Sequence, residues 1–381
     1  MSDACRNLTV IVSGGGSAGH LYPAAALALE MKRRMPQLRM VLATDEGFRQ
    51  WDKAGQAVFD ETVVLRCARL DSLRRLASPG FWNTLWGGFG DAGELIRGEQ
   101  PAAVVGFGGF ASFPCVWEAQ NRGVPTVIHE QNVGAGLANR WLARRARKRC
   151  ITFGDPAERY AGDKTVLTGY PLVFSGPRIQ RREARERLGV DLERRTLLVS
   201  GGSQGSMFLN QTVEEFFRTA PRDLMEEWQV LWVAGRARHG VSRETLESPP
   251  DNCRLWDYCD VMYLLYGACD VALTRSGAGT LHELAFYRRG ACLVPYPGSR
   301  SHQEANARAA ARFGGAMWVR QRDFGVDDLL EVMKSEMRSR GHYDRMGECL
   351  SGRLRTDGAA GLADVVEGIV ALNVESGERA E

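Results

Sequence analysis

The feature that most constrains this chain is a short apolar strand that runs into a glycine-rich loop and then into a helix, because this arrangement occurs twice. Residues 9–16 read TVIVSGGG, and residues 196–203 read TLLVSGGS. Apolar strands that alternate with helices are typical of parallel sheets covered on both faces. The two copies therefore predict an α/β fold with a duplicated, doubly wound unit.

Further short apolar segments extend this pattern through both halves of the chain. The predicted strands are 8–12, 39–43, 102–105, 126–129 and 164–167, and then 196–200, 229–233, 270–274 and 291–294. The chain has 381 residues, whereas single cores stop growing at about 250–300 residues. We therefore predict domains over 1–170 and 171–351. Ligands of such sheets bind beyond the carboxyl ends of the strands, so the expected site is a cleft between the domains.

Composition excludes several classes of protein. Apolar residues make up 44% of the chain and charged residues 25%, and the net charge of +3 is too small to predict nucleic-acid binding. The nine cysteines include no CxxC pair, and no apolar stretch approaches the ~18 residues of a membrane span. The sequence thus predicts a reduced, cytoplasmic protein with no disulfide framework, structural zinc or membrane-spanning helix.

The first glycine loop ends in His20, at the predicted start of an alanine-rich helix. Exposed N–H groups at a helix start favour anionic or oxygen-rich ligands, and the helix dipole favours a neutral imidazole that accepts a proton. A capping or packing histidine is the alternative. A Rossmann dinucleotide loop is a competing interpretation of these glycines, and Asp45 keeps it open.

Four polar residues, His129–Asn132, directly follow a predicted apolar strand. Such a run is costly to bury for packing alone, so we expect it to face the cleft. Glu130 is then a candidate general base, and Asn132 and Asn139 are candidates for binding hydroxyls. The alternative is a hydrogen-bonded network that fixes the edge of the sheet.

A nucleotide-type site is predicted in the second half, where residues 275–283 read RSGAGTLHE. The backbone N–H groups of Ala278, Gly279 and Thr280 could hold a diphosphate, with the Thr280 hydroxyl as a further donor, and Glu283 could accept the hydroxyls of a ribose. No two aspartates stand two positions apart, so an Asp-x-Asp metal clamp is absent from the sequence. We therefore predict chemistry without a metal, in which helix dipoles and hydrogen bonds stabilise the leaving diphosphate.

Taken together, the motifs resemble the N-acetylglucosaminyltransferases of glycosyltransferase family 28, in the family's order, over about residues 8–320. The matching segments are Gly15–His20, Gly106–Pro114, His129–Asn132, Gly201–Gly205 with Leu209–Thr212, Arg275–Glu283 and His302–Ala307. The resemblance implies a GT-B fold, with two Rossmann-like domains facing a cleft. It also implies a C-terminal helix at about 352–375 that packs back on the first domain. It also implies transfer of N-acetylglucosamine from UDP-N-acetylglucosamine to lipid I, undecaprenyl-pyrophosphoryl-N-acetylmuramoyl-pentapeptide. This reaction makes lipid II for peptidoglycan, with inversion and without a metal or cofactor.

The resemblance implies roles for individual residues. Contacts to the donor are implied for Ser203, Gln204, Cys259, Ala278, Gly279, Thr280, Leu281, His282, Glu283, Gln303 and Asn306. On the acceptor side the implied residues are Ser17, Ala18, Gly19, Asn132 and Asn139. His20 and Glu130 are the alternatives for activating the acceptor hydroxyl.

The chain also departs from the family pattern. Tyr170 and Val173 stand where an asparagine and an arginine are usual, and Gly279 and His282 replace a leucine and a serine. These changes leave open a related transferase that acts on another lipid or metabolite. A catalytically inactive UDP-sugar-binding protein and a nicotinamide-dependent oxidoreductase are further alternatives.

Residues 76–89, which follow Arg74 and Arg75, resemble the patch by which the family touches the bilayer. The implied contact residues are Phe81, Trp82, Leu85, Trp86 and Phe89. Aromatic residues beside arginines suit a membrane interface, and a core helix is the alternative interpretation of their spacing. A run of basic residues follows further along the chain and consists of Arg140, Arg144, Arg145, Arg147, Lys148 and Arg149. Such a run is typical either of a solvated helix face or of a surface that binds anionic lipid. The expected location is peripheral, on the cytoplasmic face of the plasma (inner) membrane, with cell-wall synthesis or division proteins as further candidate partners.

Overall fold

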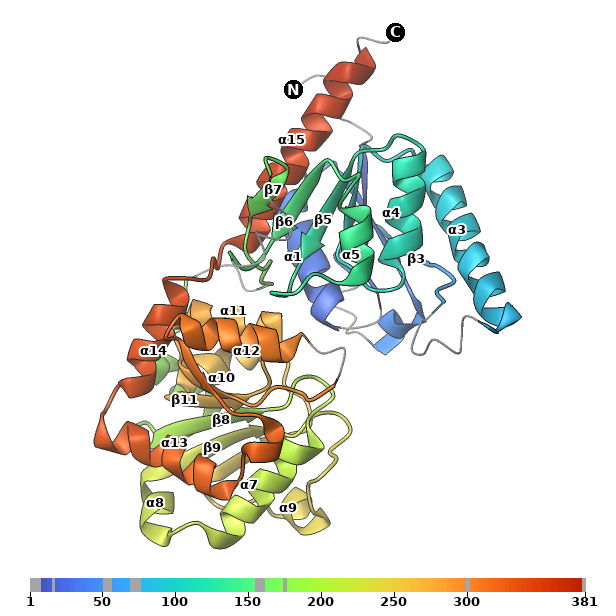
Figure 1. The fold of residues 1–381 in the computed structure, drawn as a ribbon. Helices are drawn as coiled ribbons and strands as arrows, with labels where there is room; N and C mark the ends of the chain where they lie inside the picture. The colour runs from blue at the N-terminus through green and yellow to red at the C-terminus, as the bar shows by residue number, and fades with distance from the viewer. Residues whose placement is uncertain are drawn as a thin grey trace. The chain divides into compact units, whose positions relative to one another are not determined.

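The computed structural model describes residues 8–15, 18–50, 57–68, 77–154, 162–173, 177–298 and 302–378. Two compact units make up the chain: Met1–Val173 with Asp357–Glu381, and Phe174–Thr356. Each unit has its own parallel sheet covered by helices (Figure 1). The α/β fold class with two doubly wound sheets is therefore confirmed.

The first unit contains a seven-stranded sheet in the order β3-β2-β1-β4-β5-β6-β7. Its strands are β1 (Thr9–Ser13), β2 (Arg39–Thr44), β3 (Glu61–Val64), β4 (Ala103–Gly106), β5 (Thr126–Glu130), β6 (Lys148–Ile151) and β7 (Thr165–Leu167). Its helices are α1 (Ala18–Arg34), η2 (Glu46–Gln50), α3 (Pro79–Glu99), α4 (Ser112–Asn121), α5 (Leu137–Leu142) and α15 (Gly358–Glu378). All adjacent strands pair in parallel.

The central strand β1 is buried on both faces, which explains its continuous apolar sequence. Val10 and Val12 point to one face, into a core shared with α1 and α15. Ile11 points to the other face, into a core shared with α3 and α4. In Figure 1, α15 lies on one side of this sheet and α3 and α4 on the other.

The second unit contains a six-stranded parallel sheet in the order β10-β9-β8-β11-β12-β13. Its strands are β8 (Arg195–Ser200), β9 (Trp228–Val233), β10 (Cys253–Trp256), β11 (Val271–Thr274), β12 (Ala291–Leu293) and β13 (Ala316–Trp318). Its helices are α6 (Arg181–Leu188), α7 (Met207–Thr219), α8 (Arg222–Glu227), α9 (Arg243–Glu247), α10 (Met262–Ala268), α11 (Ala278–Tyr287), α12 (Gln303–Arg312), η5 (Gln321–Asp323), α13 (Val326–Arg338) and α14 (His342–Ser351). Trp228, Trp232 and Tyr343 are the largest side chains of its core.

The basic run at residues 140–149 does not form one helix face, which corrects that expectation. Arg140 belongs to α5, whereas Lys148 and Arg149 open strand β6. Arg149 pairs with Ile128 of β5 in the ladder, so the sheet decides its conformation. Among the described helices, none is both long enough and apolar enough to cross a bilayer.

The aromatic residues of α3 also differ from those of a core helix. The residues that α3 buries are Gly88, Ala92, Gly93 and Ile96. Trp82 and Trp86 lie outside this buried stripe, with 42% and 66% of their surface exposed. Phe81 packs edge-on against Trp82, and Phe89 lies beside Trp86, so the aromatic rings gather on the N-terminal half of α3.

Candidate active site

In the first unit, the loops that follow β1 and β4 touch through their backbones. The Gly15 N–H donates to the carbonyl of Gly108 (3.3 Å), and the Phe107 N–H donates to the carbonyl of Ser13 (2.7 Å). Gly109 has φ +82°, and a Cβ on it would lie 3.0 Å from the nitrogen of Gly15. Because only glycine fits this close approach and left-handed backbone, the loops form a closely packed backbone surface at the carboxyl end of the sheet.

His20, in the first turn of α1, faces this backbone surface. Its Nδ1 lies 2.9 Å from the carbonyl oxygen of Gly15. When Nδ1–H donates to that carbonyl, Nε2 carries the lone pair of the ring. A Cβ built on Gly108 would lie 3.6 Å from Nε2 of His20 and 3.5 Å from Nδ2 of Asn139. His20 and Asn139 therefore converge on Gly108.

Glu130, at the end of β5, is only 3% exposed, and its carboxylate holds the loop that follows it. Oε1 accepts from the N–H of Asn132 (3.0 Å). Oε2 accepts from the N–H of Gly136 (3.2 Å) and from Nδ2 of Asn139 (2.9 Å). These contacts favour a network that fixes the loop, the alternative to a general base, and they hold the Asn139 amide near Gly108.

The expectation that all of His129–Asn132 faces a cleft is corrected by the structure. His129 is fully buried, its Nε2 lies 3.0 Å from the carbonyl of Gly169, and burial lowers its pKa to about 4. Gln131 is buried and donates to the carbonyl of Phe107 (2.7 Å). Both side chains satisfy backbone groups inside the unit, a use of polar residues that the local sequence does not reveal.

In the second unit, the loop between β8 and α7 exposes Ser203 and Gln204. Gly205 has φ +82°, and a Cβ there would lie 2.0 Å from the carbonyl oxygen of Ala234. The turn therefore requires glycine at this position. The loop ends at Ser206, whose hydroxyl caps α7 by accepting from the N–H of Leu209 (3.3 Å).

Arg275 is a buried cation that joins several loops at the carboxyl end of this sheet, and sequence reasoning assigned it no role. Its Nη2 donates to Oγ of Ser206 and to Oε1 of Gln321, each at 2.7 Å. Its Nη1 donates to the carbonyls of Val294 (2.9 Å) and Pro295 (3.2 Å). Burial lowers its pKa to about 10, which still leaves it charged near neutral pH. The sequence signal is an arginine placed directly after a buried strand.

Helix α11 begins three residues after Arg275, and its N-terminus presents backbone donors. Its N-cap, Gly277, has no side chain to accept from the first N–H groups of the helix. Glu283 lies one turn further along and accepts from the hydroxyl of Tyr266 (2.7 Å), and burial raises the pKa of Glu283. An anionic group at the helix start and a hydroxyl-bearing group near Glu283 fit this arrangement.

The remaining candidate residues differ in their accessibility. The side chains of Leu281, His282 and Asn306 are fully buried. The Asn306 amide donates to the carbonyl of Ser276 (3.1 Å), and this hydrogen bond fixes the loop before α11. Oε1 of Gln303 accepts from the N–H of Tyr296 (2.9 Å), and Cys259 is buried with a raised pKa.

On the acceptor side, Gly19 is exposed and Asn132 is partly buried, whereas Asn139 is buried. Ser17 and the side chain of Ala18 lie outside the described residues, as do Arg74 and Arg75.

Two doubly wound sheets, each with glycine loops and helix starts at its carboxyl end, are the architecture of the GT-B class of glycosyltransferases. Models of the glycosyltransferase family 28 N-terminal and C-terminal domains match residues 10–151 and 196–360. The chain belongs to glycosyltransferase family 28.

Curated relatives match nearly the whole chain. A Carboxydothermus hydrogenoformans protein is 31% identical, covering 95% of this chain and 98% of its own. A Chelativorans protein is 33% identical, covering 95% of both chains. Each is named UDP-N-acetylglucosamine--N-acetylmuramyl-(pentapeptide) pyrophosphoryl-undecaprenol N-acetylglucosamine transferase.

Solved structures share the fold. Acinetobacter baumannii MurG superposes with a TM-score of 0.69 at 20% identity, covering 94% of this chain and 99% of that one. The kitacinnamycin glycosyltransferase gives a TM-score of 0.70 at 18% identity, covering 96% and 100%. Because a natural-product transferase fits as well as a cell-wall one, the fold alone does not select the acceptor.

Proposed function

We propose that this chain transfers N-acetylglucosamine from UDP-N-acetylglucosamine to lipid I, giving lipid II for peptidoglycan synthesis. The observation that carries this proposal is the activity named for curated relatives at 31–33% identity over 95% of this chain. The glycine loops of both units, with His20 beside one and Arg275 beside the other, supply groups suited to that reaction.

In this proposal the second unit holds the donor. The N–H groups of Ala278–Thr280 and the exposed Ser203 and Gln204 contact the diphosphate, while Glu283 binds the ribose hydroxyls. The buried charge of Arg275 lies behind these groups and stabilises the negative charge that develops on the departing UDP. Gln303 binds the sugar, and the backbone at Cys259 meets the uracil ring. Leu281, His282 and Asn306 act through their backbones or through packing, because their side chains are buried.

The first unit holds the acceptor, with Gly19, Asn132 and the Ser17–Ala18 segment lining its site. The acceptor hydroxyl oxygen attacks the anomeric carbon of the donor, the bond from that carbon to the diphosphate oxygen breaks, and UDP leaves with the bonding electrons. Nε2 of His20 takes the hydroxyl proton. Glu130 acts as a positioning residue, because it holds Asn139 next to His20.

The proposed location is peripheral, on the cytoplasmic face of the plasma membrane. The exposed Trp82 and Trp86 of α3 support a contact with lipid, with Phe81, Leu85 and Phe89 completing the patch. Trp141 of α5 is also exposed, and the guanidinium of Arg144 lies 5.4 Å from its ring centre. Cations beside exposed aromatic rings suit an anionic membrane surface.

The direct test is a transfer assay with labelled UDP-N-acetylglucosamine and a soluble lipid I analogue, run with and without a chelator. We expect transfer to the analogue that is unaffected by the chelator. Absence of transfer would refute the proposed activity, and complete loss with the chelator would refute chemistry without a metal. A panel of other lipid and metabolite acceptors distinguishes a related transferase, a comparison that Val173 in place of the family arginine makes necessary.

A further inference from the structure

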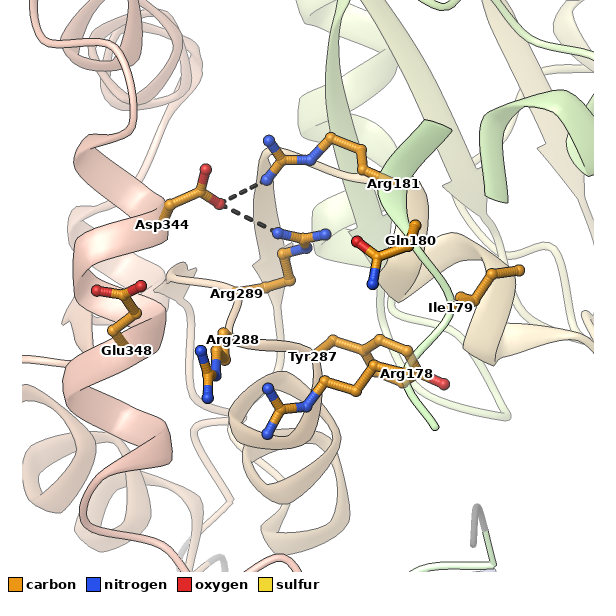
Figure 2. A pocket seen from close by; sticks show the side chains of 9 residues that line it. All are labelled: Arg178, Ile179, Gln180, Arg181, Tyr287, Arg288, Arg289, Asp344 and Glu348. Carbon is orange, nitrogen blue, oxygen red and sulfur yellow. Dashed lines mark hydrogen bonds and ion pairs between the residues drawn. The ribbon is translucent and has the colours of Figure 1, made fainter. Parts of the chain in front are cut away.

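A separate cavity of about 360 Å³ lies in the second unit, at the opposite end of α11 from the proposed donor site. The helix begins at Ala278 and ends at Tyr287, so its ten residues put about 15 Å between the two places. Four arginines and two carboxylates line the cavity: Arg178, Arg181, Arg288, Arg289, Asp344 and Glu348. As Figure 2 shows, they come from the segment before α6, the first residue of α6, the segment that directly follows α11, and helix α14.

The positive charges in this cavity are only partly neutralised. Asp344 accepts from Nη2 of Arg181 (2.5 Å) and from Nη1 of Arg289 (3.1 Å), as the dashed lines in Figure 2 show. Within the described part of the chain, no carboxylate lies within ion-pair distance of Arg178 or Arg288. Burial and then the neighbouring charge of Arg288 lower the pKa of Arg178. The two guanidinium groups therefore repel each other across the cavity, and an anion between them would relieve that repulsion.

The backbone fixes Arg288 in a conformation that does not suit an arginine. It has φ +53° at the C-terminus of α11, a left-handed position at which helices usually carry glycine. Helix α14 packs against it, since a Cβ on Gly347 would lie 2.2 Å from the Arg288 carbonyl oxygen. The N–H of Gly290 also donates to the carbonyl of Tyr343 (2.9 Å). A strained residue that the surroundings hold in place is typical of a functional position.

We propose that this cavity binds a phosphate group, carried by a small phosphomonoester or diphosphate, between Arg178 and Arg288. Planar guanidinium groups match the oxygens of phosphate in pairs, and the volume is at the lower end of ordinary ligand sites. Arg181 and Arg289 are held at the edge of the cavity by Asp344, and Arg181 also pairs with Asp270 (3.2 Å), so they contribute positive charge nearby and the direct contacts fall to Arg178 and Arg288. Glu348 opposes the bound anion and limits its affinity. This site is separate from the donor loops and goes beyond the transfer reaction.

The test is calorimetric titration of the full chain with inorganic pyrophosphate, in saturating UDP so that the proposed donor site is filled. We expect one further site, and at least about tenfold weaker binding in Arg288→Gly, which removes charge-assisted hydrogen bonds. Glycine suits the backbone at 288, so the variant should unfold at a temperature no lower than the native chain. Glu348→Gln should bind several-fold more tightly, a gain that misfolding cannot produce. Arg243→Gln is the matched control, because Arg243 is exposed on α9 and pairs with Glu247.

Vesicle flotation identifies the source of the phosphate group. A lipid headgroup predicts that Arg288→Gly floats less than Arg243→Gln with vesicles that contain phosphatidylglycerol, and equally with phosphatidylcholine alone. If the ligand is a soluble phosphate compound, Arg288→Gly and Arg243→Gln should float equally with both kinds of vesicle, while Arg288→Gly still loses affinity for pyrophosphate. Either pattern supports the site. Pyrophosphate binding that is undetectable in the native chain, or unchanged in Arg288→Gly, overturns it.

Discussion

His20 and Glu130 are both candidates for the base by sequence, and the structure shows that they differ in their hydrogen bonds. The carboxylate of Glu130 accepts from three N–H donors within residues 132–139, whereas Nδ1 of His20 lies 2.9 Å from the Gly15 carbonyl and its Nε2 lies close to Gly108. Both patterns depend on where separate loops meet. A single glycine loop or polar run cannot show which hydrogen bonds form between loops, so the sequence alone leaves both residues as candidates.

We expect His20→Gln to lower kcat by roughly 10²- to 10⁴-fold, the contribution of a general base, with little change in UDP affinity. Glu130→Gln should reduce kcat less and lower the melting temperature, because an amide nitrogen cannot accept the bonds from Gly136 and Asn139. Steady-state kinetics and thermal melts of both variants distinguish the roles. An equal loss of kcat in Glu130→Gln, with native stability, would assign the base to Glu130.

The buried His129 should make the first unit sensitive to acid. Its pKa is lowered from 6.5 to about 4 by burial, so the folded state keeps it neutral while the unfolded state binds a proton below pH 6.5. Its contribution to the free energy of unfolding is therefore lost as the pH falls from 6.5 to 4, and reaches about 3 kcal/mol. Urea unfolding of the native chain and His129→Gln at pH 7 and pH 4.5 measures this difference. A variant that loses as much stability between the two pH values as the native chain would contradict the assignment.

At the scale of elements, the sequence predicts a strand correctly where the strand's own residues are apolar and buried. It misses a strand where pairing with a neighbouring strand determines the conformation. β1 and β8 are apolar throughout and enter glycine turns, so their own residues specify them. Strands β3, β6, β10 and β13 were not predicted. Each carries polar or exposed residues near a sheet edge, and a neighbouring strand provides the ladder that makes it a strand.

The packing of α14 on the end of α11 requires a glycine. Gly347→Ala should lower the free energy of unfolding by about 1–3 kcal/mol, because its Cβ would meet the backbone of Arg288, which cannot move aside like a side chain. Gly352→Ala is the control at the end of the same helix, where a Cβ would lie 3.5 Å from the nearest atom. Denaturant unfolding compares the two. Equal free energies of unfolding for the two variants would show that α14 shifts to make room for the added Cβ at position 347 with no loss of stability.

The exposed tryptophans of α3 give a prediction for the element as a whole. A Trp82→Ser, Trp86→Ser double variant should bind anionic vesicles at least about tenfold more weakly, because two large apolar side chains no longer leave water on binding. Its melting temperature should be unchanged, since neither residue belongs to the buried stripe of α3. Leu29→Ser, at another exposed apolar position, is the control in the same flotation assay. Native vesicle binding by the double variant would exclude α3 as the lipid contact.

At the scale of the whole molecule, the chain enters the second unit after Val173 and returns to the first at Asp357. The returning helix α15 is part of the first core, where Leu362, Val366 and Val370 are buried with α1. Arg34 of α1 secures it through ion pairs with Asp364 (2.7 Å) and Glu367 (2.9 Å). The second unit is therefore an insertion in the first, and the two ends of the chain depend on each other for stability.

This arrangement predicts unequal damage when α15 is removed. A chain that ends at Thr356 should lose amide protection in β1 and β4, since each large apolar side chain of α15 contributes about 1.5–3 kcal/mol when buried. Protection in β8 and β11 should persist, because the core of the second unit contains no residue of α15. Hydrogen exchange followed by mass spectrometry reads both sheets in one experiment, with a chain that ends at Glu378 as the control that retains the helix. Native protection throughout the shortened chain would show that α15 rests on a core that is already complete, and equal loss in both sheets would show that the two units unfold as one.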